Sequence, residues 1–121
     1  MKIIDYIGNT PIIKVENIFN NKKADVFVKL EEFNPGGSVK SRPGVQMVLD
    51  AQKQGILRKN KMILEPTGGN TGIGITLAAT TLGYKVILVI PDNFSKEKIN
   101  TLHSHNKCNT VMNEVNESVC L

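Results

Sequence analysis

A lysine placed directly after a glycine-rich turn is the first residue of this sequence that could do chemistry. The turn and the lysine form residues 34–40, with the sequence NPGGSVK, and a helix is expected to begin just after Lys40. The N-terminus of a helix carries partial positive charge, so it disfavours a cation and favours the neutral form of the lysine amine. A neutral amine is the nucleophile that forms imines with carbonyl compounds. An exposed lysine without a chemical role is the simpler interpretation of this residue taken alone.

A second glycine-rich loop follows about thirty residues later, a spacing typical of a strand–helix–strand unit. It spans residues 65–72, with the sequence EPTGGNTG. Its glycines let the backbone approach a ligand closely, and the start of the next helix offers N–H groups that suit a carboxylate or a phosphate. The loop matches neither the G-x-x-x-x-G-K-[ST] nor the G-x-G-x-x-G phosphate motif. The simpler interpretation is an ordinary strand–helix turn that Thr67 or Asn70 caps.

Apolar patterning places each loop between a strand and a helix. The expected strands are residues 12–15, 24–30, 61–64 and 86–90, and the expected helices are residues 42–54, 71–82 and 96–102. Strands separated by single helices predict an α/β protein with a parallel sheet, and the unbroken apolar run 86–90 is typical of a strand buried on both faces. Because ligands bind at the carboxyl ends of parallel strands, the two loops should converge. An anion-binding loop beside a neutral lysine suits a Schiff-base enzyme that acts on an amino acid.

Local signals set the ends of the predicted helices. Ser41 is a suitable N-cap for the first helix, and Gly55 and Gly83 should end the first and second helices. After about residue 103 the apolar pattern weakens, and no further strong element is expected. A parallel sheet of so few strands has an uncovered edge, which natural folds avoid. The sequence therefore reads as the open-ended part of something larger.

Composition excludes several other classes of function. The chain has 121 residues, of which 40% are hydrophobic and 21% are charged, as in an ordinary globular domain. Its net charge is only +4, its basic residues are scattered and aromatic residues make up 5%, which argues against nucleic-acid binding. The run 86–90 is too short to span a membrane, and no signal peptide is visible, so we expect a cytoplasmic protein. The spacing of Cys108, Cys120, His103 and His105 predicts no metal site.

Four segments of the chain resemble the cysteine synthase family (O-acetylserine sulfhydrylase), which belongs with cystathionine β-synthase to the fold-type II pyridoxal-phosphate enzymes. These segments are 7–11 (IGNTP), 34–43 (NPGGSVKSRP), 65–74 (EPTGGNTGIG) and 83–92 (GYKVILVIPD). Their order and spacing resemble the N-terminal part of the family over residues 1 to about 101. The resemblance implies an α/β fold with the three-layer, tryptophan synthase β-like, parallel-sheet architecture, here incomplete. It assigns residues 1–40 to the large cofactor domain, 41–102 to most of the small substrate-loop domain, and 103–121 to a divergent tail.

The resemblance also implies a role for each matched residue. Lys40 would bind pyridoxal 5'-phosphate covalently and later remove the α-proton of an amino-acid substrate, and Asn70 would hydrogen-bond the ring hydroxyl of the cofactor. The residues that would bind the substrate α-carboxylate are Thr67, Gly68, Gly69 and Thr71. The implied reaction is a β-replacement in which O-acetyl-L-serine and sulfide give L-cysteine and acetate. For the full-length family the resemblance implies a homodimer.

The chain departs from the family pattern in three places. Ser41 stands where members usually carry Asp, a change that keeps an N-capping side chain. Gly68 stands where Ser is common, which bears on substrate choice. The loop that binds the cofactor phosphate, and the serine that meets the pyridine nitrogen, belong downstream of these 121 residues. We therefore expect a truncated chain, produced by a frameshift near residues 101–105, that is inactive alone.

Two other functions stay open at this point. One is a non-catalytic remnant that binds an anion or a partner chain through its unfinished sheet edge. The other is a different β-replacement branch, such as cystathionine β-synthase, because that branch shares the same motifs.

Overall fold

The computed structural model describes residues 1–16, 24–67, 69–91, 100, 109–113 and 118–119. The helices are α1 (Ser41–Lys53) and α2 (Asn70–Leu82), with short 3-10 turns η1 (Ile3–Tyr6) and η2 (Glu31–Phe33). The strands are β1 (Ile12–Val15), β2 (Val26–Lys29), β3 (Met62–Pro66), β4 (Lys85–Pro91), β5 (Asn109–Asn113) and β6 (Ser118–Val119). The described residues contain no helix that is both long and apolar enough to cross a membrane.

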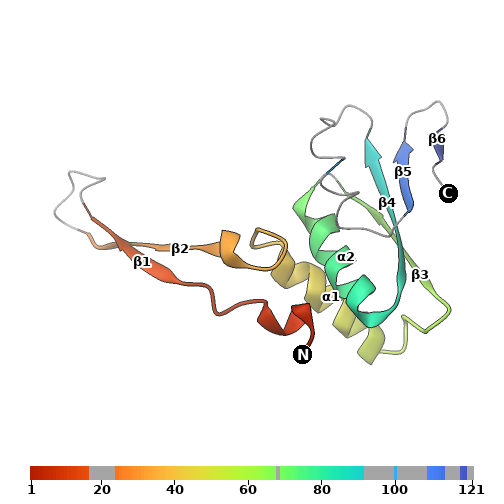
Figure 1. The fold of residues 1–121 in the computed structure, drawn as a ribbon, viewed down its shortest axis with the longest axis horizontal. Helices are drawn as coiled ribbons and strands as arrows, with labels where there is room; N and C mark the ends of the chain where they lie inside the picture. The colour runs from red at the N-terminus through yellow and green to blue at the C-terminus, as the bar shows by residue number, and fades with distance from the viewer. Residues whose placement is uncertain (17–23, 68, 92–99, 101–108, 114–117, 120–121) are drawn as a thin grey trace.

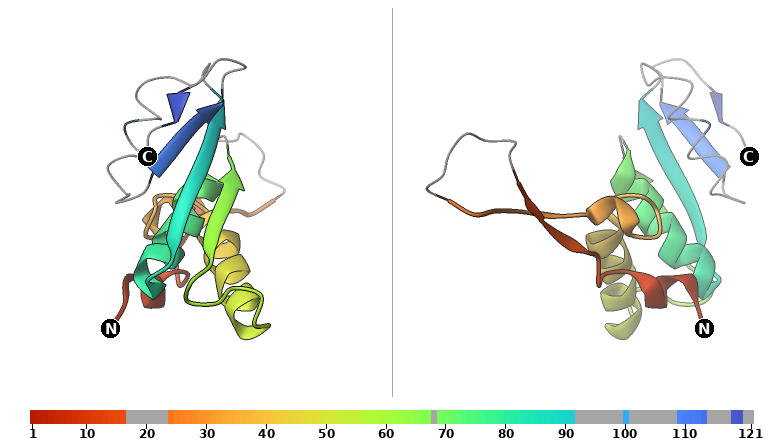
Figure 2. Two further views of the ribbon diagram at one scale, coloured as in Figure 1. Left: turned by 90° about the vertical axis from the view of Figure 1, so that its right-hand side faces the viewer. Right: turned by 60° about the vertical axis from the view of Figure 1, so that its left-hand side comes forward.

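A sheet of four strands in the order β3-β4-β5-β6 forms one side of the molecule (Figure 1). Strands β3, β4 and β5 are parallel, and β6 is antiparallel to β5. Helix α2 contacts β3 and β4, and α1 packs along α2. Figure 2 (left) shows the sheet in front of both helices, so the two helices lie on the same side of it. The predicted α/β fold with a parallel sheet is confirmed.

Strand β4 is buried more on one face than on the other. Val86, Leu88 and Ile90 are almost completely buried, whereas Ile87 and Val89 keep partial exposure. The first set belongs to the main hydrophobic core, to which α2 also contributes. The apolar run therefore reflects one fully buried face and one half-buried face. The expected full burial of both faces is not seen, because the described helices cover only one of them.

Both helices end where the sequence predicts. Gly55, directly after the last turn of α1, has φ +71, and Gly83 caps α2 with φ +81; glycine adopts this left-handed conformation without strain. The start of α1 differs from the prediction, because Lys40 occupies the N-cap position and Ser41 is the first helical residue. Ser41 donates its hydroxyl hydrogen bond to the carbonyl oxygen of Pro35. The predicted N-cap at Ser41 is therefore wrong by one residue.

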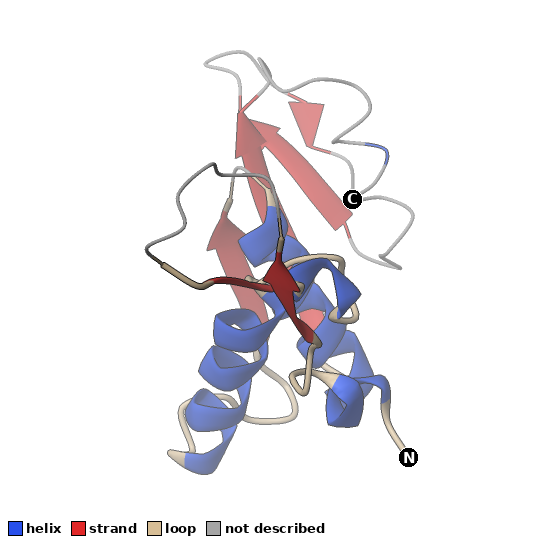
Figure 3. Ribbon diagram, turned by 90° about the vertical axis from the view of Figure 1, so that its left-hand side faces the viewer, coloured by secondary structure: helices blue, strands red, loops and turns tan. Residues whose placement is uncertain are grey.

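The first two strands form a separate hairpin-like sheet. β1 and β2 pair antiparallel, with Ile13 opposite Val28 and Val15 opposite Val26. Figure 1 shows this pair extending away from the helices, and Figure 3 places it on the side of the helices opposite the large sheet. The prediction that residues 24–30 join the parallel sheet is wrong. A parallel neighbour needs a long crossover, whereas antiparallel strands pair through a short connection.

The C-terminal part adds a strand that the sequence did not predict. β5 pairs with β4 in parallel, with Val111 opposite Val89, so the core sheet extends past residue 103. The apolar part of β5 is brief, and its place in the sheet depends on pairing with β4. Most of the predicted helix 96–102, both histidines and both cysteines lie outside the described residues.

Candidate functional site

The two glycine-rich loops converge where the helices that follow them touch. A Cβ atom added to Gly74, in the second turn of α2, would lie 2.6 Å from the carbonyl oxygen of Lys40. One added to Gly44 of α1 would lie 2.6 Å from the carbonyl carbon of Gly74. The helices therefore meet through their backbones, and the start of α1 lies directly against α2. The two loops therefore meet, as expected, but the first loop follows β2 of the separate two-stranded sheet, so the expected shared edge of one parallel sheet is not what brings them together.

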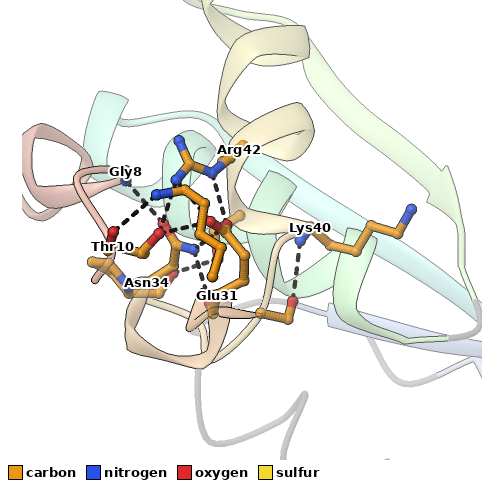
Figure 4. Close-up of polar contacts among 10 residues, drawn as sticks. Gly8, Thr10, Glu31, Asn34, Lys40 and Arg42 are labelled. Carbon is orange, nitrogen blue, oxygen red and sulfur yellow. Dashed lines mark hydrogen bonds and ion pairs between the residues drawn. The ribbon is translucent and has the colours of Figure 1, made fainter. Parts of the chain in front are cut away.

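Lys40 combines a fixed backbone with an exposed side chain. Its N–H donates to the hydroxyl of Ser38 at 3.2 Å, and its carbonyl oxygen accepts from the N–H of Gly44 at 3.0 Å. The side chain is exposed, and within the described part of the chain its amine has no hydrogen-bond or ion-pair partner. Figure 4 shows the side chain extending away from the neighbouring polar residues. A primary amine held in this way is open to a carbonyl compound that arrives from solvent.

Thr67 holds the second loop together from inside. It is 7% exposed, and its hydroxyl oxygen accepts hydrogen bonds from the N–H groups of Gly69 at 3.3 Å and Gly72 at 3.1 Å. Its own N–H donates to the carbonyl oxygen of Val89 at 2.9 Å, which ties the end of β3 to β4. Thr67 therefore stabilises the first turn of α2, as the simpler interpretation of this loop proposed. Its expected role in substrate binding stays a prediction.

The residues around the start of α2 present groups that suit an anion. Asn70 is exposed, and Gly69 and Thr71 are half-buried. Among the described residues, the N–H groups and side chains of Asn70 and Thr71 have no hydrogen-bond partner. Unpaired N–H groups at a helix start attract a carboxylate or a phosphate. Gly68 lies outside the described residues, so its expected role is untested, and those of Gly69, Asn70 and Thr71 stay predictions as well.

A polar cluster beside Lys40 was missed at the level of sequence. We call it the Glu31 cluster; its members are Gly8, Thr10, Glu31, Asn34 and Arg42. Arg42 donates from Nε to Glu31 Oε2 at 2.7 Å and from Nη2 to Glu31 Oε1 at 2.9 Å. Thr10 donates to Glu31 Oε1 at 2.7 Å, and Asn34 donates to Glu31 Oε2 at 2.8 Å. The side-chain oxygen Oδ1 of Asn34 accepts from the N–H of Gly8 at 2.8 Å.

Charge in the Glu31 cluster is strongly paired. The hydrogen bond from Arg42, supported by one from Thr10, lowers the pKa of Glu31 from 4.5 to about 2. The bond to Glu31 raises the pKa of Arg42. The side chains are 19% exposed at Glu31 and 37% at Arg42. The sequence did show a carboxylate, Glu31, before the glycine-rich turn and a guanidinium, Arg42, after it. Nothing in their separation along the chain indicated that the two side chains form a pair.

Within the described part of the chain, no group of three or more His, Cys, Asp or Glu residues is placed to hold a metal ion.

Comparisons with a family model and with individual proteins identify the same group of relatives. A family model described as pyridoxal-phosphate dependent enzyme matches residues 3–117. A probable cysteine synthase of Bacillus subtilis (strain 168) is 46% identical over 101 residues, which cover 84% of this chain and 32% of the relative. A cystathionine beta-synthase of Apis mellifera is 47% identical over 104 residues, which cover 84% of this chain and 21% of the relative.

The fold agrees with solved structures as well. The crystal structure of cysteine synthase (OASS) from Entamoeba histolytica matches with a TM-score of 0.87 and 33% identity, over 93% of this chain and 34% of that one. The chain thus spans 32%, 21% and 34% of these three proteins, about a third or less.

Proposed function

Because the chain belongs to the family of pyridoxal-phosphate dependent enzymes, we propose that it carries the lysine side of a cysteine synthase-like β-replacement site. The observation that carries this proposal is Lys40 itself. Its backbone is held against α2 at Gly74 and its side chain is exposed, and among the described residues the N–H groups that begin α2 have no hydrogen-bond partner. The proposed substrates are O-acetyl-L-serine and sulfide, and the proposed products are L-cysteine and acetate.

The residues present fit one end of the cofactor that this family uses. The exposed amine of Lys40 suits the aldehyde group, and the exposed carboxamide of Asn70 suits the ring hydroxyl. Pyridoxal phosphate, when bound, supplies an electron sink for bonds at the substrate Cα. Lys40 would hold the cofactor, and its released amine would take the α-proton of the substrate.

The loop before α2 would hold the substrate carboxylate. The N–H groups of Gly69 and Thr71, with the Thr71 hydroxyl, are the proposed donors, since a carboxylate is favoured at a helix start. Gly68 is included in this proposal through the family resemblance alone. Thr67 contributes by keeping the loop in shape, because its hydroxyl already accepts two backbone hydrogen bonds. The loop would thus orient the amino acid so that its α-proton faces Lys40.

Two further possibilities have an observation in their favour. Cystathionine β-synthase activity is supported by the 47% identity to the Apis mellifera protein, which is close to the value for the B. subtilis relative. A partner-binding role without catalysis is supported by the exposed apolar residues of β1 and β2, among them Ile12, Ile13, Phe27 and Val28. Cystathionine β-synthase activity would differ from the main proposal in the nucleophile that attacks and in the group that leaves the substrate β-carbon.

Several other features stay predictions. We propose that these 121 residues alone are inactive, since they span about a third of their cysteine synthase relatives. The division at residues 40 and 102, the divergent tail, the homodimer of the full-length protein, the cytoplasmic location and the absence of nucleic-acid binding are likewise predictions.

The proposal is tested by trapping the lysine that reacts with the cofactor. The 121-residue chain is mixed with pyridoxal phosphate, the adduct is reduced with borohydride, and the labelled peptides are quantified by mass spectrometry. We expect about tenfold more label at Lys40 than at Lys53, which lies in the last turn of the same helix. Lys40→Ala should remove this label, and Lys53→Ala should leave it. Equal labelling of the two lysines would contradict the proposed site.

The same preparation tests the expected inactivity. With O-acetyl-L-serine and sulfide we expect no formation of L-cysteine above the rate without protein. Turnover that depends on Lys40 would overturn the prediction of an inactive chain, and it would strengthen the proposed reaction.

A further inference from the structure

The Glu31 cluster joins three segments that are separate in the sequence. Gly8 and Thr10 precede β1, Glu31 and Asn34 lie in and after η2, and Arg42 is in the first turn of α1. Lys29, at the end of β2, adds a hydrogen bond from its amine to the carbonyl oxygen of Thr10 at 2.8 Å. The cluster therefore attaches the start of α1 to the segment that leads into the hairpin.

The contact between Glu31 and Arg42 fixes direction as well as distance. Two nearly parallel hydrogen bonds, of 2.7 and 2.9 Å, join the guanidinium to the two carboxylate oxygens. Such a bidentate pair has one preferred orientation, whereas a single lysine–carboxylate contact has many. The remaining acceptor positions of Glu31 are filled by Thr10 and Asn34, so the carboxylate cannot turn to another partner easily.

Lys40 lies two residues before Arg42 and points the other way. Figure 4 shows the Glu31 cluster on one side of the helix start and the Lys40 side chain leaving on the other. The glycine-rich turn just before it contains Gly36 and Gly37, both with positive φ, and is closed by local hydrogen bonds, one of them from the Ser41 hydroxyl to the carbonyl oxygen of Pro35. Beyond these local bonds, two contacts with other segments orient the helix start: the backbone of Gly74 on one side and the Glu31 cluster on the other.

We propose that Glu31 and Arg42 are a positioning pair that orients the first turn of α1 so that the Lys40 amine is presented to the cofactor. This inference rests on the proposed function, because it assigns a task to residues that do not touch the cofactor themselves. The pair acts through the backbone of Lys40, and its loss would let the first turn rotate about its contact with Gly74 while the rest of α1 stays packed on α2.

The test measures the selectivity of labelling in folded protein. Glu31→Gln removes the charge and keeps the shape, and Arg42→Lys keeps the charge and removes the bidentate geometry. The readout is the ratio of label at Lys40 to label at Lys53 after reaction with pyridoxal phosphate and reduction with borohydride. We expect this ratio to fall about tenfold in Glu31→Gln and several-fold in Arg42→Lys, since small displacements of a reacting group have large effects on rate.

A matched control uses the ion pair between Lys14 and Asp25, whose atoms are 2.6 Å apart on the exposed hairpin. Asp25→Asn makes the same change of charge as Glu31→Gln, and it should leave the ratio unchanged. Amide exchange of Val45 and Val48, buried residues of α1, verifies that each variant is folded.

Each outcome has a distinct meaning. If the unchanged chain labels Lys40 no more than Lys53, the proposed function fails and this inference falls with it. If the unchanged chain is selective and folded Glu31→Gln and Arg42→Lys are equally selective, only the positioning role is overturned. Loss of amide protection in both variants would also overturn it, because the pair would then stabilise the fold and not the placement of one lysine.

Discussion

The two loops of the site are held in different ways. The turn before Lys40 has local hydrogen bonds, such as that of Ser41 with Pro35, and is also tied to distant segments through the Glu31 cluster. The loop before α2 is fixed from within, because Thr67 bonds to backbone groups that follow it by two and five residues. The first loop depends on charge and on the packing of separate segments, whereas the second depends on sterics and on one hydroxyl. Substitutions should therefore affect the two loops by different mechanisms, and conditions such as pH should affect only the first.

The largest expected effect comes from filling the space beside Thr67. A Cβ atom on Gly72 would lie 2.4 Å from Cγ2 of Thr67, a buried side chain that has little room to move. We expect Gly72→Ala to lower the free energy of unfolding by about 2–3 kcal/mol, as overpacking of a core does. Unfolding in urea measures this change in the free energy of unfolding.

The double variant Thr67→Ser with Gly72→Ala is the control for this effect. Serine lacks Cγ2 and keeps the hydroxyl, so it should recover a large part of the loss. Lack of any recovery would show that the backbone of α2, and not Thr67, sets the requirement for glycine.

A smaller effect is expected from removing the hydroxyl that caps the second loop. Thr67→Val keeps the volume but removes the hydroxyl that accepts from the N–H groups of Gly69 and Gly72, so that the Gly72 N–H keeps only its bond to the carbonyl oxygen of Gly69. The expected loss in the free energy of unfolding is about 1–2 kcal/mol, typical of a lost helix cap. Thr67→Ser serves as the control, because it retains the acceptor. If valine and serine have the same effect, the hydroxyl does not hold this loop.

The first loop should respond to pH in a way that the second does not. The pKa of Glu31 is lowered from 4.5 to about 2 by the hydrogen bond from Arg42. A carboxyl whose pKa is lowered in the folded state contributes its full stability above the unfolded pKa, and the contribution is lost as the pH falls toward the folded pKa. The stability difference between the unchanged chain and Glu31→Gln should be constant from pH 7 to about 5, and it should shrink between about 4.5 and 2.

Chemical denaturation at a series of pH values measures this difference. Asp25→Asn is the control with the same change of charge, at a pair whose side chains are 47% and 66% exposed, and its effect should stay below about 0.5 kcal/mol. A difference for Glu31→Gln that does not change with pH would contradict the assignment of the low pKa to the pair with Arg42.

Local signals in the sequence predicted the elements of the core well. Gly55 and Gly83 end the two helices because glycine adopts positive φ there, and the apolar run 86–90 becomes the central strand β4. The same residues predicted that the two loops meet, but the reason given for it does not hold. The first loop follows β2, which lies outside the parallel sheet, and the loops meet because α1 packs against α2.

Features that depend on contacts between distant residues were not predictable in this way. β2 has the composition of a sheet strand, but its partner is β1, and no local pattern distinguishes the two pairings. β5 is short and becomes a strand only through pairing with β4. The Glu31 cluster depends on the fold that brings residues 10, 31 and 42 together. The sequence around a charged residue does not indicate which residue it will pair with. The Ser41 hydroxyl likewise bonds to Pro35, which only the folded turn brings near.

The contact between Gly74 and Lys40 has a mechanical consequence. Backbone atoms meet there without an intervening side chain, so nothing between α2 and the start of α1 can change rotamer to absorb a displacement. A ligand that draws the loop before α2 toward itself would therefore also displace the first turn of α1. The position of the Lys40 amine would in this way depend on whether a ligand is bound at the loop before α2.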